Sequence, residues 1–211
     1  MEPSSPKSVP KPKRPLFLTI ALIVGWTFGI GGVMNGCGIL RFYQEPNAEV
    51  QVAPPAEEGL GAYFAEQQRA SEKATADALS ANQARMVPLA VANALLSALL
   101  IFACARALAA KPGAHILALQ AVAANILYAV ADFILYSPVR EAVVDSMILR
   151  PPPGQVENFD PKQLALAATW SFRMFAVAHV ITLGFIAYAL SRPAVITFFQ
   201  SDNKKPPNEE I

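Results

Sequence analysis

Residues 25–37 read GWTFGIGGVMNGC, an uncharged run in which glycines recur at steps of four, three and four residues. This spacing places Gly25, Gly29, Gly32 and Gly36 along one side of an α-helix. The row contains two GxxxG units, which let the backbone of a second helix approach closely within a membrane. The pattern therefore predicts a membrane helix with a smooth packing face.

Two other interpretations of this run compete with the first. A basic start, an apolar run and Gly36-Cys37 imitate a lipoprotein signal that is cleaved before a lipidated cysteine. However, Met34 and Asn35 replace the leucine-like and small residues usual there, and the run exceeds the roughly 7–15 residues of a signal's apolar region. Cleavage would leave three spans. A hinge is disfavoured because the glycines share one face, so we expect an uncleaved first span.

The chain holds three more blocks that are almost free of charge. Charged residues make up 16% of the chain, and none occurs in residues 15–40, 86–105 or 174–191, while residues 112–139 contain only Asp132. Soluble domains carry about 25% charged residues, and a helix needs ~20 apolar residues to cross a bilayer. The sequence thus predicts an all-α integral membrane protein, a four-transmembrane-helix bundle. The spans are expected at about residues 16–38, 87–109, 114–136 and 172–192.

Basic residues cluster at three places: before the first span, in the short connection between the second and third spans, and after the fourth span. They are Lys7, Lys11, Lys13 and Arg14 before the first span, Arg106 and Lys111 after the second, and Arg192, Lys204 and Lys205 after the fourth. Cytoplasmic segments of membrane proteins carry an excess of Lys and Arg. We therefore expect both termini to face the cytoplasm (N-in, C-in) in the cell membrane, inner or plasma.

The other segments are expected to flank or connect the membrane domain, residues 16–192. Residues 1–15 are predicted to form a disordered basic cytoplasmic arm. Residues 193–211 are a cytoplasmic tail whose apolar start, AVITFFQ, lies along the inner interface. The extracytoplasmic loops, 39–86 and 137–171, are expected to be helical. Helices are predicted over about 61–86, after Ser137-Pro138, and from Asp160-Pro161 continuously into the fourth span.

The second span offers the natural neighbour for the glycine row. Ala90, Ala94 and Ala98 recur every four residues beside Asn93 and Ser97. Small residues permit close contact between membrane helices, and polar side chains tie such helices together with modest energy. A second copy of the first span is the alternative partner, which would make a homo-oligomer.

Four polar or charged residues in the third and fourth spans are further candidates. Counting from the inner basic residues puts Asp132 and Arg173 at similar height near the outer boundary, where they are predicted to pair. The alternative gives Asp132 an ion- or proton-handling role. Asn125 shares a helix face with Asp132. His179, about 10 Å deeper, either shuttles protons or donates a hydrogen bond to a neighbouring helix.

Several function classes find no support in the sequence. It contains none of the common motifs for hydrolysis, nucleotide binding or metal binding. The chain has two histidines, His179 and His115, and His115 is predicted at the inner boundary, far from His179. No metal or other cofactor is therefore expected. Cys37 and Cys104 are predicted to lie most of a bilayer apart, beyond the reach of a disulfide. A net charge of +1 gives no case for nucleic acid.

These features favour a non-enzymatic interaction or scaffold protein. Embedded in the lipid bilayer, the bundle would present its extracytoplasmic helices to another membrane protein or to a second copy. The alternative is a small transporter or channel subunit with a polar path through Asn125, Asp132 and His179. That path would need ionisable groups in the inner half of the bundle, where the sequence has few.

Overall fold

The computed structural model describes residues 14–44, 60–111, 113–148 and 161–202, and these ranges contain seven α-helices and no strand. In chain order the helices are α1 (Leu16–Gln44), α2 (Leu60–Ala81), α3 (Gln83–Leu108), α4 (Ala114–Leu135), α5 (Ser137–Ile148), α6 (Pro161–Leu190) and α7 (Pro193–Asp202). Four of them, α1, α3, α4 and α6, are long and apolar enough to cross a membrane. The expectation of an all-α protein with four long apolar helices is confirmed.

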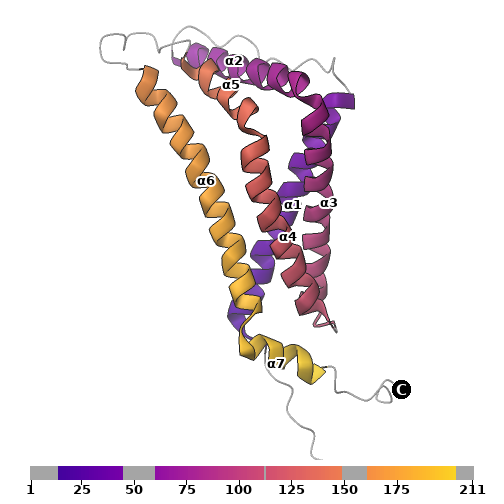
Figure 1. The fold of residues 1–211 in the computed structure, drawn as a ribbon. Helices are drawn as coiled ribbons and strands as arrows, with labels where there is room; N and C mark the ends of the chain where they lie inside the picture. The colour runs from indigo at the N-terminus through magenta and orange to yellow at the C-terminus, as the bar shows by residue number, and fades with distance from the viewer. Residues whose placement is uncertain (1–13, 45–59, 112, 149–160, 203–211) are drawn as a thin grey trace, which may run out of the picture.

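The four long helices run beside one another, and the short helices lie at their two ends (Figure 1). Helices α2 and α5 pack together across one end, and we call this pair the cap. Helix α7 lies at the opposite end, the α7 end. Figure 1 shows α6 close to the other long helices at the α7 end and diverging from them toward the cap.

Two buried clusters hold this arrangement together. The larger cluster lies toward the α7 end and draws side chains from all four long helices and α7, including Leu22, Leu100, Val122, Leu183 and Phe199. The smaller cluster joins the cap to the long helices. Its fully or nearly buried members are Leu79, Met86, Leu89 and Val139. Among the α6 residues whose burial the structure describes, the buried ones begin at Leu183, because the outer half of the helix stands away from the bundle (Figure 1).

The outward faces of the long helices are apolar and exposed. Large side chains that are more than half exposed occur on each of them, among them Met34, Leu95, Leu127 and Phe175. Continuous apolar surface of this kind marks contact with lipid or another protein. Combined with the length of the four helices, it favours hydrocarbon as their solvent.

Helix boundaries differ from expectation in two places. Helix α1 continues to Gln44, beyond the predicted end at residue 38. The predicted helix over about 61–86 instead ends at Ala81, and α3 begins at Gln83, before the predicted start of the second span. The junction is Asn82, whose side-chain amide donates to the Ala78 carbonyl at 2.8 Å. An asparagine that bonds the preceding turn competes with the helix and favours a break there.

The starts of α5 and α6 match the signals Ser137-Pro138 and Asp160-Pro161 in the sequence. Helices α5 and α6 begin at Ser137 and Pro161, as predicted. The Ser137 hydroxyl donates to the Ile134 carbonyl at 2.9 Å. The AVITFFQ segment is helical, and Phe199 is buried with its ring stacked on His115 at 5.3 Å between centroids. The predicted arm at residues 1–13 lies outside the described residues.

Candidate functional site

The glycine row of α1 faces α3. A Cβ atom built on Gly36 would lie 2.8 Å from the Ala90 carbonyl oxygen and 3.0 Å from the Ala94 nitrogen, and one on Gly29 would lie 2.9 Å from the Ser97 carbonyl oxygen. These are backbone atoms, which cannot move aside as a flexible side chain can. The same construction on Gly31 or Gly38 meets nothing within 4 Å. Close approach of the two helices therefore depends on the side of α1 that carries the row.

The α3 side of this contact differs from the predicted alanine row. Ala90 and Ala94 contact Gly36, but Ala98 is exposed. Steps of four residues turn 40° past a full helical circle each time, so a row built only on such steps drifts off the contact face. The face of α3 that meets the glycines continues through Ser97, Ile101 and Cys104.

Two polar side chains on α3 lie in this contact. The Ser97 hydroxyl donates to the Asn93 side-chain oxygen at 3.2 Å, and both residues are buried. A Cβ atom on Gly32 would overlap the Ser97 hydroxyl oxygen. The hydroxyl thus occupies the space left by the missing side chain of Gly32. The two cysteines are free, with Cys104 buried beside Gly25 and Cys37 exposed.

Asn125 ties α4 to α3. Its side-chain amide donates to the Leu96 carbonyl at 3.1 Å and to the Ala121 carbonyl of its own helix at 2.8 Å. The side chain is buried beside the fully buried Ala118 and Ala121. Both hydrogen bonds of the amide nitrogen are used between helices or within α4, which is what a structural asparagine does.

Asp132 has a different partner from the one predicted. Its carboxylate lies 3.1 Å from the Tyr128 hydroxyl, which is also 3.3 Å from the Leu89 carbonyl. Among the described residues Asp132 and Arg173 form no ion pair, and the Arg173 guanidinium lies over the Trp170 ring at 5.5 Å. The prediction of a pair was wrong because α6 diverges from α4 toward the cap, so equal height along the bundle does not bring the two side chains together (Figure 1).

His179 packs its ring against α1. Its ring is 4.9 Å from the Phe28 ring of α1, at a tilt of 48°. A pair of rings at this distance and angle adds stabilising contact between α6 and α1. His179 and Asp132 are close enough to interact electrostatically. Among the described residues, no hydrogen bond or ion pair joins His179 to Asp132.

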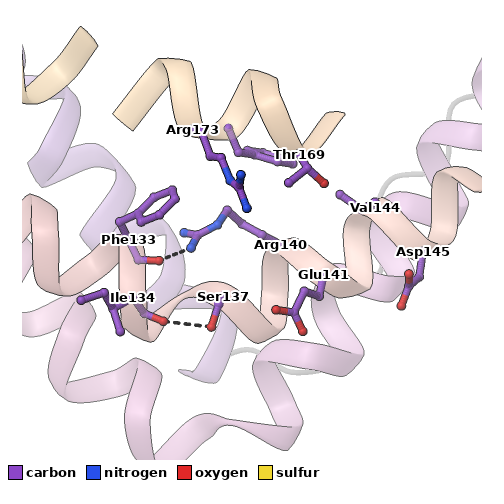
Figure 2. A pocket seen from close by; sticks show the side chains of 10 residues that line it. Phe133, Ile134, Ser137, Arg140, Glu141, Val144, Asp145, Thr169 and Arg173 are labelled. Carbon is purple, nitrogen blue, oxygen red and sulfur yellow. Dashed lines mark hydrogen bonds between the residues drawn. The ribbon is translucent and has the colours of Figure 1, made fainter. Parts of the chain in front are cut away.

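A cleft of about 510 Å³ opens at the cap end, between the end of α4, α5 and the outer half of α6. Its lining residues are Phe133, Ile134, Ser137, Arg140, Glu141, Val144, Asp145, Thr169, Phe172 and Arg173. Figure 2 shows the Arg173 side chain extending from α6 toward Arg140 on α5. Two guanidinium groups from two elements thus share one cleft.

The Arg140 side chain is held in place from α4. Its guanidinium donates to the Phe133 carbonyl and lies 4.2 Å from the centroid of the Phe133 ring. Burial lowers the pKa of Arg140 from its ordinary value, and the nearby Asp132 and Glu141 carboxylates oppose that shift. An arginine side chain keeps its charge under such conditions. Arg140 therefore presents a fixed positive charge to the cleft.

Only one of the charged residues of this cleft was predicted from the sequence. Arg173 was a candidate, whereas Arg140, Glu141 and Asp145 were not. They belong to a loop helix in which a charge is ordinarily solvated, and no local pattern indicates a partner element. The packing of α5 against the diverging α6 creates the cleft, so only the order and tilt of the helices could have revealed it.

The fold and these contacts define a class: an all-helical protein with four helices able to span a membrane and a charged cleft at one end of the bundle. Comparison with models of protein families, with curated proteins and with solved structures finds no match to this chain. Its function therefore has to be argued from its own residues. Within the described residues no three His, Cys, Asp or Glu side chains are grouped so as to hold a metal ion.

Proposed function

We propose that this protein is a non-enzymatic, multi-pass membrane protein that presents its cap to a partner protein outside the cytoplasm. The observation that carries this proposal is that the cap is preformed and docked on the bundle. Leu79 of α2 and Val139 of α5 are buried with Met86 and Leu89 of α3 in one cluster. A surface ordered before binding loses little conformational entropy when a partner arrives.

Hydrogen bonds reinforce the docked cap. The Tyr43 hydroxyl at the end of α1 donates to the Leu79 carbonyl of α2 at 2.9 Å. The Gln67 amide of α2 donates to the Ser146 carbonyl of α5 at 3.4 Å. The opposite side of α2 carries exposed polar residues, including Lys73 and Asp77. A rigid element with a polar free side is suited to recognition by a partner in water.

The proposed orientation places the α7 end in the cytoplasm and the cap outside. Arg14, Arg106, Lys111 and Arg192 all lie next to ends of the long helices that are distant from the cap. The Arg14 guanidinium donates to the Leu108 carbonyl at the end of α3, at 2.6 Å. By the positive-inside rule this end is cytoplasmic. The chain would then reside in the cell membrane, inner or plasma, with both termini inside.

The contacts of α1 also bear on the proposed homo-oligomer. We propose that the GxxxG row serves the packing of α1 on α3 within one chain, because Gly29 and Gly36 lie against the α3 backbone. A second copy of α1 cannot use the same face without displacing α3. Self-association, where it occurs, is then expected through the cap or through the exposed face of α6.

The transport alternative has less support. The Asn125 amide is bonded to two carbonyls, one of them on α3. Beyond Asn125 toward the α7 end, fully buried aliphatic side chains from all four long helices fill the bundle. A polar path through Asp132 and His179 would have to cross this apolar cluster. We therefore favour a structural role for the three residues.

Photocrosslinking in intact membranes tests the partner proposal. A photoreactive amino acid in place of Lys73 or Asp77 samples the free side of α2. The same photoreactive amino acid in place of Leu95, which is 66% exposed on α3, serves as the lipid-facing control. We expect a discrete crosslinked species at the α2 positions that is missing at Leu95. A product twice the mass of the chain identifies a second copy as the partner. Absence of any species specific to α2 would refute the proposal.

Cysteine labelling tests the orientation separately. In a Cys37→Ser background, Lys73→Cys reports on the cap and Lys111→Cys on the α3–α4 connection, and Cys104 is buried. A membrane-impermeant maleimide added to intact cells should modify the first and spare the second. Both should react after the membrane is opened. The reverse pattern in intact cells would overturn the proposed orientation.

A further inference from the structure

We infer that the cleft between α5 and α6 binds the headgroup of an amine-bearing phospholipid, with its phosphate between Arg140 and Arg173. This inference depends on the membrane setting of the four long helices. It does not depend on the proposed partner of the cap, which is tested on α2. The arginines, the depth of the cleft, the apolar surface beneath it and its two carboxylates each bear on the assignment.

The two arginines form the phosphate subsite. They come from different helices and line one cleft, and Figure 2 shows Arg173 extending toward Arg140, whose guanidinium is directed toward the Phe133 carbonyl. Neither guanidinium forms an ion pair with a carboxylate among the described residues; Arg140 bonds the Phe133 carbonyl and Arg173 lies over Trp170. Two positive charges in one cleft repel each other, and an anion bound between them removes that repulsion. Guanidinium groups match phosphate oxygens with paired, charge-assisted hydrogen bonds.

The cleft lies at the depth of lipid headgroups. It forms where α4 ends at Leu135 and where the apolar stretch of α6, which begins at Ala165, has just started. Phe133 and Phe172 line it, and Trp170 is exposed next to it. Aromatic side chains with Trp and Tyr prominent among them gather at the membrane–water interface. A phosphate bound here needs no displacement from its normal position in the bilayer.

Apolar surface continues from the cleft into the membrane. Ile134 lines the cleft and is 63% exposed. Toward the α7 end, further apolar residues at helical spacing from Ile134 on α4 and from Arg173 on α6 are exposed as well. On α4 these are Val130 and Leu127, and on α6 they are Val177 and Ile181. Side chains three or four residues apart share one helix face. Acyl chains attached to a headgroup in the cleft would lie against these two stripes.

The acidic residues of the cleft indicate which headgroup fits. Glu141 and Asp145 line it from α5, and Figure 2 shows both carboxylates directed away from the two guanidinium groups. The lining thus holds two positive and two negative charges in separate places. A headgroup with a phosphate and a primary ammonium is complementary to this set, and the ammonium donates hydrogen bonds that a quaternary amine lacks. A cleft of about 510 Å³ is within the usual size of ligand sites.

Native mass spectrometry of the full chain, after purification with lipids of identical acyl chains, tests the assignment. We expect phosphatidylethanolamine to be retained about tenfold more than phosphatidylglycerol or phosphatidylcholine, which corresponds to the loss of one good charged contact. The Arg140→Gln/Arg173→Gln variant should lose at least about tenfold in retained phosphatidylethanolamine. The matched control, Arg106→Gln/Arg192→Gln, removes the same charge at the α7 end and should bind as the wild type does.

Two further variants keep the test decisive. Arg173→Gln alone leaves the Arg140–Phe133 contact intact, so a loss of lipid with unchanged thermal stability cannot be assigned to misfolding. Glu141→Gln/Asp145→Asn should abolish the preference for phosphatidylethanolamine over phosphatidylglycerol while phosphatidylglycerol is still bound.

Three results would overturn the inference. Equal lipid retention by the wild type and both arginine variants would exclude the cleft as the site. Equal retention of phosphatidylglycerol and phosphatidylethanolamine by the wild type would exclude the amine subsite. Displacement of the lipid by inorganic phosphate alone at similar concentration would identify a site for a free anion instead.

Discussion

The close contact between α1 and α3 at Gly36 predicts the effect of a single methyl group. Gly36→Ala puts a Cβ atom 2.8 Å from the Ala90 carbonyl oxygen and 3.0 Å from the Ala94 nitrogen, whereas Gly38→Ala, two residues further along α1, adds a Cβ atom with nothing within 4 Å. Both changes are glycine to alanine in the same helix, and they differ in what the new methyl group meets. The comparison therefore isolates the packing of α1 on α3.

The magnitude follows from two opposing contributions. Alanine in place of glycine within a helix stabilises by about 0.5–1 kcal/mol, and this gain is common to both variants. Overpacking a close contact costs about 1–3 kcal/mol. Gly38→Ala should thus be neutral or slightly stabilising, and Gly36→Ala should be less stable than Gly38→Ala by the overpacking cost alone. For a chain of this size that difference corresponds to a fall in Tm of roughly 2–12 °C.

Thermal unfolding in mild detergent, followed by circular dichroism, measures the difference directly. Gly29→Ala should behave like Gly36→Ala, since its new methyl group meets the Ser97 carbonyl at 2.9 Å, and Gly31→Ala should behave like Gly38→Ala. Equal stability of Gly36→Ala and Gly38→Ala would refute the reasoning, because it would mean that α1 and α3 can separate at no cost. So would a ranking of the four variants that ignores which face they occupy.

Three other substitutions test individual contacts by the same unfolding measurement. Asn125→Ala removes two hydrogen bonds and should destabilise by about 1–2 kcal/mol; a stability gain would show that the amide is held at a cost for another role. Tyr128→Phe loses the hydroxyl beside Asp132 and should cost about 1 kcal/mol, and the loss should be smaller if Asp132 is changed first, because only the Leu89 carbonyl then remains as a partner. Phe199→Ala empties a buried site and should cost about 3 kcal/mol, whereas the exposed Thr197→Ala should leave stability unchanged. Equal stability of these two variants would mean that α7 is not docked on the bundle.

The long helices were predictable because each depends on a property of a contiguous segment. Uncharged runs of ~20 residues satisfy their own backbone hydrogen bonds as helices and bury their side chains in hydrocarbon, whatever their neighbours are. The starts of α5 and α6 at Ser137 and Pro161 are likewise local, since a proline in the first turn acts within a few residues. The break at Asn82 was missed because an alanine-rich pattern on both sides outweighs one asparagine in any sequence reading.

The contacts between helices were only partly predictable from the sequence. The glycine row could be read from spacing, whereas its partner face on α3 could not, because Ala98 fits the four-residue step and yet is exposed. Asp132 and Arg173 were expected to pair from their depth alone. Depth is a single coordinate along the bundle, and the tilt of α6 separates residues that share it.

The sequence by itself thus determined where the four long apolar helices lie and which side of α1 can be approached closely, since those features follow from composition and helical period. Only the tertiary structure decided which helices meet, that Asp132 bonds Tyr128 in place of Arg173, and that Arg140 of a short loop helix shares a cleft with Arg173. Those outcomes depend on the angles at which separate helices pack. Such angles are set by side chains distant in the chain, which no local pattern records.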